Sequence, residues 1–250
     1  MALSFFLRLM LGHLIGDFFL QPYWLVMAKR KGWPGLFIHV GVVTFVTAIL
    51  IWASIPNWWV WLIILYAGHL LIDQFRTFVF TDNSKGKGLL LLLLDQLAHL
   101  VLISLLAWAA TGWTFSDLQI LLTANASNQY RLMVYLSGLI VMIGVVPVLE
   151  AEITAAAWAV QGSKVGYTIE INNIDRVLGS IERIVAAVLI LTGYGLAVPL
   201  IFVPRLALMI YQGQANANRT AVVSKVSTSF VSAVIVGIFL IQVPIPSLSL

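Results

Sequence analysis

The sequence predicts an all-α polytopic membrane protein, a transmembrane helical bundle of about seven spans, within a range of about six to eight. Hydrophobic residues make up 61% of the 250 residues and charged residues only 10%, whereas soluble domains carry about 25% charged residues. The mean hydropathy is +0.99. The apolar residues also form runs of about 20, the length that a helix needs to cross a bilayer.

Eight apolar runs are candidate spans, at residues 3–27, 34–56, 57–80, 88–111, 131–160, 177–195, 196–211 and 220–242. The run 196–211 is short and contains two prolines. It is therefore a complete span, a re-entrant segment or the bent end of the preceding helix. We expect two domains: residues 1–112 as a four-helix membrane bundle and residues 130–245 as a second bundle of three or four helices.

The connectors between the first spans have the composition of helix starts and turns. Pro34 and Gly35 are typical of the first turn of a helix, and Pro56 with Asn57 predicts a tight turn into the third span. Tryptophans gather near the expected span ends, as in the aromatic belts of membrane proteins. These boundaries indicate separate helices joined by short links.

Lysine and arginine collect in alternate loops. They occur at Lys29, Arg30, Lys31, Arg76, Lys85, Lys87, Lys164 and Arg176, whereas the loop 112–129 holds none. Because basic residues favour the cytoplasmic side, this alternation predicts a multi-pass protein with its N-terminus outside. It also explains the net charge of +4 without a nucleic-acid partner.

All four histidines lie within the first hundred residues, and three of them have an aspartate one helical turn away. The pairs are His13 with Asp17, His69 with Asp73, and Asp95 with His99, and the fourth histidine is His39. Each pair lies in an apolar stretch long enough to cross a membrane. Ionisable groups at such depth are costly and usually mark a functional site.

An internal repeat connects these residues. Residues 12–19 and 68–75 share Gly, His, Leu, Asp and the final Phe at an offset of 56, and the same offset carries His39 onto Asp95. We interpret this as a tandem repeat of a two-helix unit. With the predicted orientation, each aspartate lies on the cytoplasmic side of its histidine, because the order of the pair reverses with the direction of the helix. The sequence therefore predicts a histidine layer and an aspartate layer within one bundle.

Imidazole and carboxylate groups are the ligands of many metal sites. The chain has no cysteine, so a metal site here has only nitrogen and oxygen donors. We expect a divalent metal ion, such as zinc, manganese or iron, held within the four-helix bundle. The candidate ligands are His13, Asp17, His39, His69, Asp73, Asp95 and His99. Seven groups suit two metals, or one metal with the aspartates supporting the histidines.

A metal with an open coordination position can activate water for hydrolysis. We therefore expect a metal-dependent hydrolase that acts on a lipid or on a phosphorylated, lipid-linked substrate. Two alternatives use the same residues differently. In one, the histidines and carboxylates form the relay of a proton- or ion-coupled transporter. In the other, the histidine and the aspartate of each pair form a hydrogen bond with each other. The protein is then an accessory subunit of a membrane complex or a homo-oligomer.

A second group of charged residues lies in the second half of the chain. It consists of Glu150, Glu182, Arg183 and Arg205. We favour interhelical ion pairing that orients the two halves. In the alternative, Glu150 or Glu182 reaches the metal, or the two arginines bind a phosphate group.

The motifs His13-Leu-Ile-Gly-Asp17, His69-Leu-Leu-Ile-Asp73 and Asp95-Gln-Leu-Ala-His99 resemble those of the DUF-3307 family of uncharacterised bacterial integral membrane proteins. The resemblance covers about the first hundred residues, and Leu178-Gly-Ser-Ile-Glu182-Arg183 is similar to an element of longer family members. It implies a bacterial inner-membrane location and no established activity. The pattern is also distantly similar to bacterial membrane-bound metal-dependent hydrolases.

Overall fold

In the computed structural model the described residues are 1–79, 88–123, 126–160, 173–211 and 214–245. Every regular element within these ranges is a helix, which confirms the predicted all-α class. The chain divides into two compact units. Of the described residues, the first unit contains 1–79, 91–123, 126–140 and 243–245, and the second contains 88–90, 141–160, 173–211 and 214–242.

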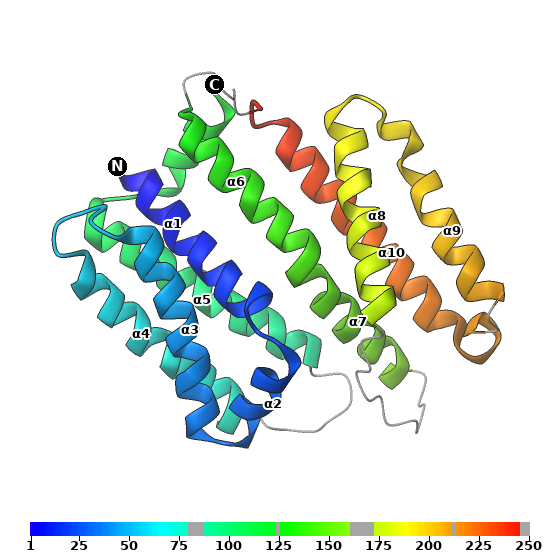
Figure 1. The fold of residues 1–250 in the computed structure, drawn as a ribbon, viewed down its shortest axis with the longest axis horizontal. Coiled ribbons are helices and arrows are strands. Elements are labelled where there is room, and N and C mark those ends of the chain that lie inside the picture. The colour runs from blue at the N-terminus through cyan, green and yellow to red at the C-terminus, as the bar shows by residue number, and fades with distance from the viewer. Residues whose placement is uncertain (80–87, 124–125, 161–172, 212–213, 246–250) are drawn as a thin grey trace. The chain divides into compact units, whose positions relative to one another are not determined.

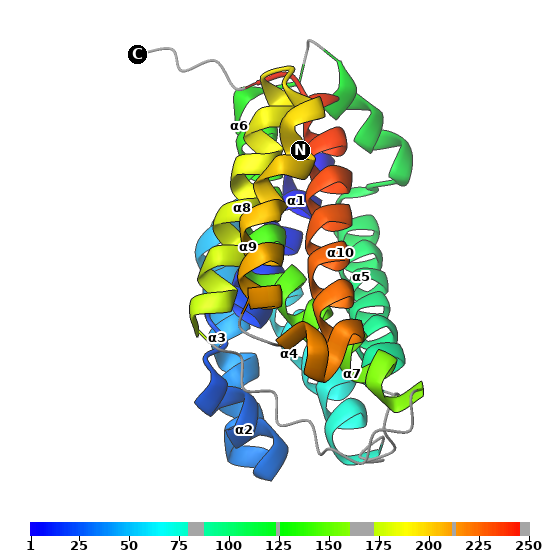
Figure 2. The same ribbon diagram turned by 90° about the vertical axis from the view of Figure 1, so that its right-hand side faces the viewer.

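The first unit is built mainly from long apolar helices (Figure 1). Its elements are α1 (Ala2–Leu14), the π-helical turn η1 (Ile15–Phe19), α2 (Tyr23–Lys31), α3 (Trp33–Ile51), α4 (Trp58–Gln74), the π-helical turn η2 (Phe75–Val79), α5 (Gly88–Thr111), the 3-10 helix η3 (Phe115–Leu122) and α6 (Asn128–Ile140). The helix α3 packs against both α1 and α4, and the short α2 packs near the beginning of α3 (Figures 1 and 2).

The second unit is also helical. Its elements are the π-helical turn η4 (Val141–Val145), α7 (Val146–Val160), α8 (Asn173–Leu191), the 3-10 turn η5 (Gly195–Ala197), α9 (Val198–Tyr211) and α10 (Gln214–Ile241). Figure 2 shows α8, α9 and α10 running alongside one another. Their core contains Ala186, Val198, Phe202 and Ala233.

Six helical segments of the described chain are long and apolar enough to cross a membrane. They are Ala2–Phe19, Trp33–Ile51, Trp58–Phe78, Gly88–Thr111, Asn128–Ala157 and Val222–Ile241. The chain is therefore a multi-pass membrane protein, and the number of spans lies at the lower end of the predicted range. The helix α8 is absent from this set because it carries several charged residues, and Gly195–Met209 forms a shorter apolar helix.

The first span is shorter than we expected from the run 3–27. The π-helical turn η1 ends at Phe19, and a separate helix starts at Tyr23. The cause is Pro22, which lacks the amide hydrogen of a helix interior and adopts an extended backbone at the start of α2. The chain therefore turns after Phe19, and α2 folds back onto α3.

Glycines allow the site-bearing helices to approach one another closely. A Cβ atom on Gly16 would lie 2.7 Å from the Cα of Val43, and one on Gly12 would lie 3.0 Å from the Cα of Thr47. On α4, a Cβ atom on Gly68 would lie 2.7 Å from a side-chain methyl of Leu102 on α5. Small residues commonly permit such packing between membrane helices. The glycines that precede His13 and His69 in the repeat therefore mark tight helix contacts.

Candidate metal centre

The structure brings the seven predicted ligands together inside the first unit. All seven are buried and no more than 6% exposed. His13 and Asp17 come from α1 and η1, and His39 from α3. Asp95 and His99 come from α5, and the remaining pair, His69 and Asp73, from α4. Four different helical segments therefore supply one cluster.

The shortest contacts between histidine and aspartate side chains in this cluster join different helices. The Nε2 atom of His39 lies 3.1 Å from Oδ2 of Asp73, and Nε2 of His69 lies 3.3 Å from Oδ1 of Asp17. By contrast, the histidine–aspartate pairs within one helix are 3.7 to 3.9 Å apart. These separations are too long for hydrogen bonds. The two side chains of each pair one turn apart therefore do not hydrogen-bond to each other, and they meet groups from neighbouring helices.

The cluster contains two overlapping sets of three potential ligands. The first set is His13, His69 and His99, and the second is Asp17, His39 and His69. In each set, one ligand atom from every residue lies within 4.8 Å of the others. The imidazole rings of His69 and His99 have centroids 4.2 Å apart, and those of His13 and His99 are stacked at 4.8 Å. His69 belongs to both sets and lies at the centre of the arrangement.

Hydrogen bonds orient two of the histidines. The Nδ1 atom of His99 lies 2.9 Å from the backbone oxygen of Asp95, which can only accept, so a neutral His99 carries its proton on Nδ1. The Nε2 atom of His13 lies 3.2 Å from Oε1 of Gln96, whose amide nitrogen donates to Oδ2 of Asp95. Neutral His13 therefore donates from Nε2. The lone pairs of His13 Nδ1 and His99 Nε2 remain available for a ligand.

Each of the seven residues has a buried polar atom without a hydrogen-bond partner in the described structure. These atoms are His13 Nδ1, Asp17 Oδ1, His39 Nε2, His69 Nε2, Asp73 Oδ1, Asp95 Oδ1 and His99 Nε2. Most buried polar atoms in proteins have a partner, so a group of this size needs an explanation. A cation that accepts several lone pairs at once would satisfy such a group.

Two basic residues reach the carboxylates of the cluster. Lys29, on α2, places Nζ 3.5 Å from Oδ2 of Asp73. Arg76, in η2, donates from Nη1 to Oδ2 of Asp95 over 2.9 Å. Gln21 holds Lys29 from the other side, because its side-chain oxygen accepts from Nζ over 3.0 Å when the amide is oriented to satisfy both of its groups.

Four further residues contact the cluster that were not predicted from the sequence: Lys29, Arg76, Gln21 and Gln96. Arg76 and Gln96 had a usable signal, because Arg76 follows Asp73 by about one helical turn and Gln96 is adjacent to Asp95. Lys29 had none. Its position depends on the fold of α2 back onto α3, which does not show in local sequence periodicity.

The second charged group lies within the second unit and forms its own network. The Arg183 guanidinium is fully buried and donates to Oε1 of Glu150, Oγ of Ser229 and the backbone oxygen of Met142, over 2.7 to 2.9 Å. Arg205 donates to Oε2 of Glu182 over 3.2 Å. Both carboxylates are thus paired with arginines, and the network joins four helices, α7, α8, α9 and α10, of a single unit.

The fold and the buried cluster define a multi-pass helical membrane protein with a histidine–aspartate centre. Residues 5–128 match the model of a family described as "Protein of unknown function (DUF3307)", and the chain belongs to that family. The matched segment contains all seven residues of the cluster. No curated protein and no solved structure matches the chain.

Proposed function

We propose that the protein binds a divalent metal ion in its first unit and uses it for hydrolysis in the membrane. The observation that carries the proposal is the convergence of seven buried residues with nitrogen and oxygen donors, several of whose atoms have no hydrogen-bond partner in the described structure. A buried polar atom without a partner costs about 1–3 kcal/mol. Nε2 of His39, Nε2 of His69 and Oδ1 of Asp17 lie 3.1 to 3.5 Å from oppositely polar atoms, so the largest penalties fall on the other four atoms of the cluster. One bound cation would remove several of these penalties together.

The charge of the cluster favours one ion rather than two. Three carboxylates (Asp17, Asp73 and Asp95) face two basic side chains, Lys29 and Arg76, so neutral histidines leave one net negative charge. One divalent ion changes this to one net positive charge, whereas two ions would leave three. Uncompensated charge in a low-dielectric interior is expensive. His69 belongs to both ligand sets, which also favours a single ion.

Nitrogen and oxygen donors suit zinc, manganese or iron. Three histidines are the ligands of one class of catalytic zinc site, and they leave a fourth position for water or substrate. The set His13, His69 and His99 has this composition.

In this proposal the metal supplies a Lewis acid that activates a water molecule. Asp17, whose Oδ1 lies 3.3 Å from Nε2 of His69, would serve as the proton acceptor for such a water. The oxygen of the water would form the new bond to the carbonyl carbon or phosphorus of the substrate, and the ester oxygen would leave with a proton. A lipid or a phosphorylated, lipid-linked molecule is the proposed substrate because the centre lies between helices that are long and apolar enough to cross a membrane.

Elemental analysis of the purified full chain tests the metal and identifies its ligands. We expect a near-stoichiometric divalent metal in the unchanged protein and its loss in His69→Ala, because His69 belongs to both ligand sets. His99→Ala removes the metal if the three histidines bind it, and His39→Ala removes it if the mixed set does. Ser104→Ala, on the same helix as His99, is the matched control. Equal trace metal in the unchanged protein and His69→Ala would refute the proposal.

A further inference from the structure

We propose that Lys29 and Arg76 bind an anionic phosphate group of the substrate beside the metal, an inference that rests on the proposed metal centre. Both basic side chains contact carboxylates of the cluster, and they come from separate elements, α2 and η2. In the described structure Lys29 pairs with Asp73 and Arg76 with Asp95, and the two cations compensate the charge of these carboxylates. With a divalent ion bound, the positive and negative charges of the centre would balance differently.

A divalent ion at the cluster takes over much of the interaction with the carboxylates. The centre then has one net positive charge, and Lys29 and Arg76 have less negative charge to face. An anionic ligand restores the balance, and phosphate oxygens are the natural partners of lysine and arginine. With a metal bound, the two basic side chains would therefore be available to an anion as well as to Asp73 and Asp95.

Arg76 contacts the buried cluster and is itself partly exposed. Its side chain is 25% exposed, whereas the Asp95 side chain that it contacts is only 2% exposed. The Lys29 side chain is 10% exposed and lies deeper. Arg76 is thus the more accessible of the two cations, and the proposed phosphate group would contact it together with the more deeply buried Lys29.

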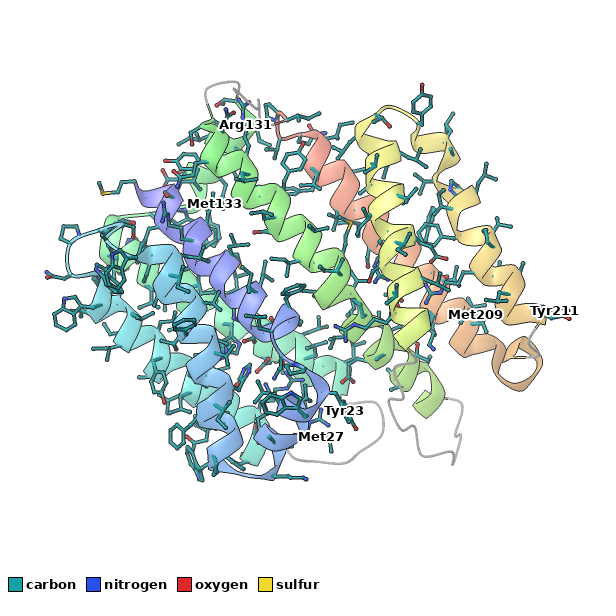
Figure 3. The ribbon with its side chains drawn as sticks, in the orientation of Figure 1. Tyr23, Met27, Arg131, Met133, Met209 and Tyr211 are labelled. Atoms are coloured by element: carbon teal, nitrogen blue, oxygen red, sulfur yellow. The ribbon has the colours of Figure 1, made fainter. Side chains whose placement is uncertain are left out.

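The surface around α2 favours a lipid headgroup as the source of this phosphate. Tyr23 and Trp24 are 66% and 61% exposed, and the basic residues Arg30 and Lys31 at the end of α2 are also exposed. Figure 3 places Tyr23 and Met27 on this helix. Aromatic and basic side chains on a short helix are typical of the membrane–water interface. The site is then adjacent to the level at which lipid phosphates lie.

The test is calorimetric titration of the metal-loaded full chain with inorganic phosphate. Charge-assisted hydrogen bonds contribute about 1.5–3 kcal/mol, so Lys29→Met and Arg76→Met should each weaken phosphate binding by about tenfold or more. Arg30→Met, an exposed neighbour on α2, is the matched control and should bind as the unchanged protein does. Lys29→Arg and Arg76→Lys keep the charge and should retain most of the affinity.

Metal content, measured on every sample, separates this inference from the proposed function. Loss of phosphate binding with full metal content supports a role for the two cations in anion binding. Unchanged phosphate affinity in metal-loaded Lys29→Met and Arg76→Met overturns it, although the metal centre would stand. Absence of metal from the unchanged protein overturns the metal centre and this inference together.

A second arm identifies the source of the phosphate. The metal-loaded chain is reconstituted in phosphatidylcholine vesicles with or without phosphatidic acid, and competition with inorganic phosphate is measured. If phosphatidic acid weakens phosphate binding in the unchanged protein and equally in Arg30→Met, the ligand is a lipid headgroup. If phosphatidic acid has no effect, the site takes free phosphate and the lipid assignment is wrong.

Discussion

Nε2 of His13 on α1 lies 3.2 Å from Oε1 of Gln96 on α5, a contact between residues 83 positions apart. Gln96 also donates to Oδ2 of Asp95, so its oxygen is held in the acceptor position. The contact therefore selects the tautomer of His13 in which Nδ1 is free. Gln96 is thus a positioning residue for a histidine on another helix.

Replacement of this glutamine should weaken metal binding without removing a ligand. In Gln96→Leu, His13 loses its acceptor and its proton can move to Nδ1, so we expect metal affinity to fall by about 10–100-fold. Competition with a chromophoric chelator measures the change. Ser104→Ala on the same helix should leave the affinity unaltered, and an equally unaltered affinity in Gln96→Leu would contradict this role.

Metal removal should destabilise the protein reversibly. A ligand present at 100 times its dissociation constant stabilises the native state by about 2.7 kcal/mol. Chelation should therefore lower the melting temperature of the detergent-solubilised chain, and added metal should restore it. Acidification should act in the same direction, because protons compete with the metal for imidazole and carboxylate groups. His69→Ala should melt at one temperature with or without chelator, and a persisting shift in that variant would place the metal elsewhere.

The position of α2 depends on the close approach of Gly35 to the end of α2. A Cβ atom on Gly35 would lie 2.6 Å from the backbone nitrogen of Lys29, whereas one on Gly41 of the same helix would have no neighbour within 4 Å. We expect Gly35→Ala to destabilise the chain by about 1–3 kcal/mol through overpacking. Gly41→Ala should be neutral or stabilise it by up to about 1 kcal/mol. Unfolding measurements on both variants in one detergent compare them directly, and equal stabilities would contradict the packing argument.

The Arg183 network should dominate the stability of the second unit. Arg183→Leu leaves Glu150 buried with Oε2 3.7 Å from Arg205, its remaining charged partner among the described residues. Breaking a buried ion pair in this way costs about 3–5 kcal/mol. The double variant Glu150→Leu, Arg183→Leu removes both charges and should be more stable than Arg183→Leu. Denaturant-induced unfolding measures both, and additive losses would show that the two side chains act independently.

Orientation is open to direct measurement because the natural chain has no cysteine. The predicted orientation places Ser116 outside and Lys31 in the cytoplasm, and both positions are exposed. In intact cells, a membrane-impermeant maleimide should label Ser116→Cys but not Lys31→Cys. Permeabilised cells should allow labelling of both, which controls for reactivity. The reverse pattern in intact cells would invert the assigned topology.

The sequence by itself determined the helical membrane class and the seven residues that converge. Runs of about 20 apolar residues and pairs one turn apart are local features, since a helix repeats every 3.6 residues. The repeat that relates His13 and Asp17 to His69 and Asp73 showed that the pairs on separate helices belong to equivalent positions of one bundle. The end of the first span at Phe19 also had a visible cause, Pro22, although the run 3–27 obscured it.

The tertiary structure alone decided which groups of the cluster meet. The short contacts of His39 with Asp73 and of His69 with Asp17 join different helices, and so does the bond between His13 and Gln96. Their distances depend on how closely helices pack, which glycines such as Gly12 and Gly16 set through contacts distant in the chain. The approach of Lys29 to Asp73 likewise required the fold of α2. Sequence periodicity describes one helix at a time, whereas a centre built from four segments is a property of their packing.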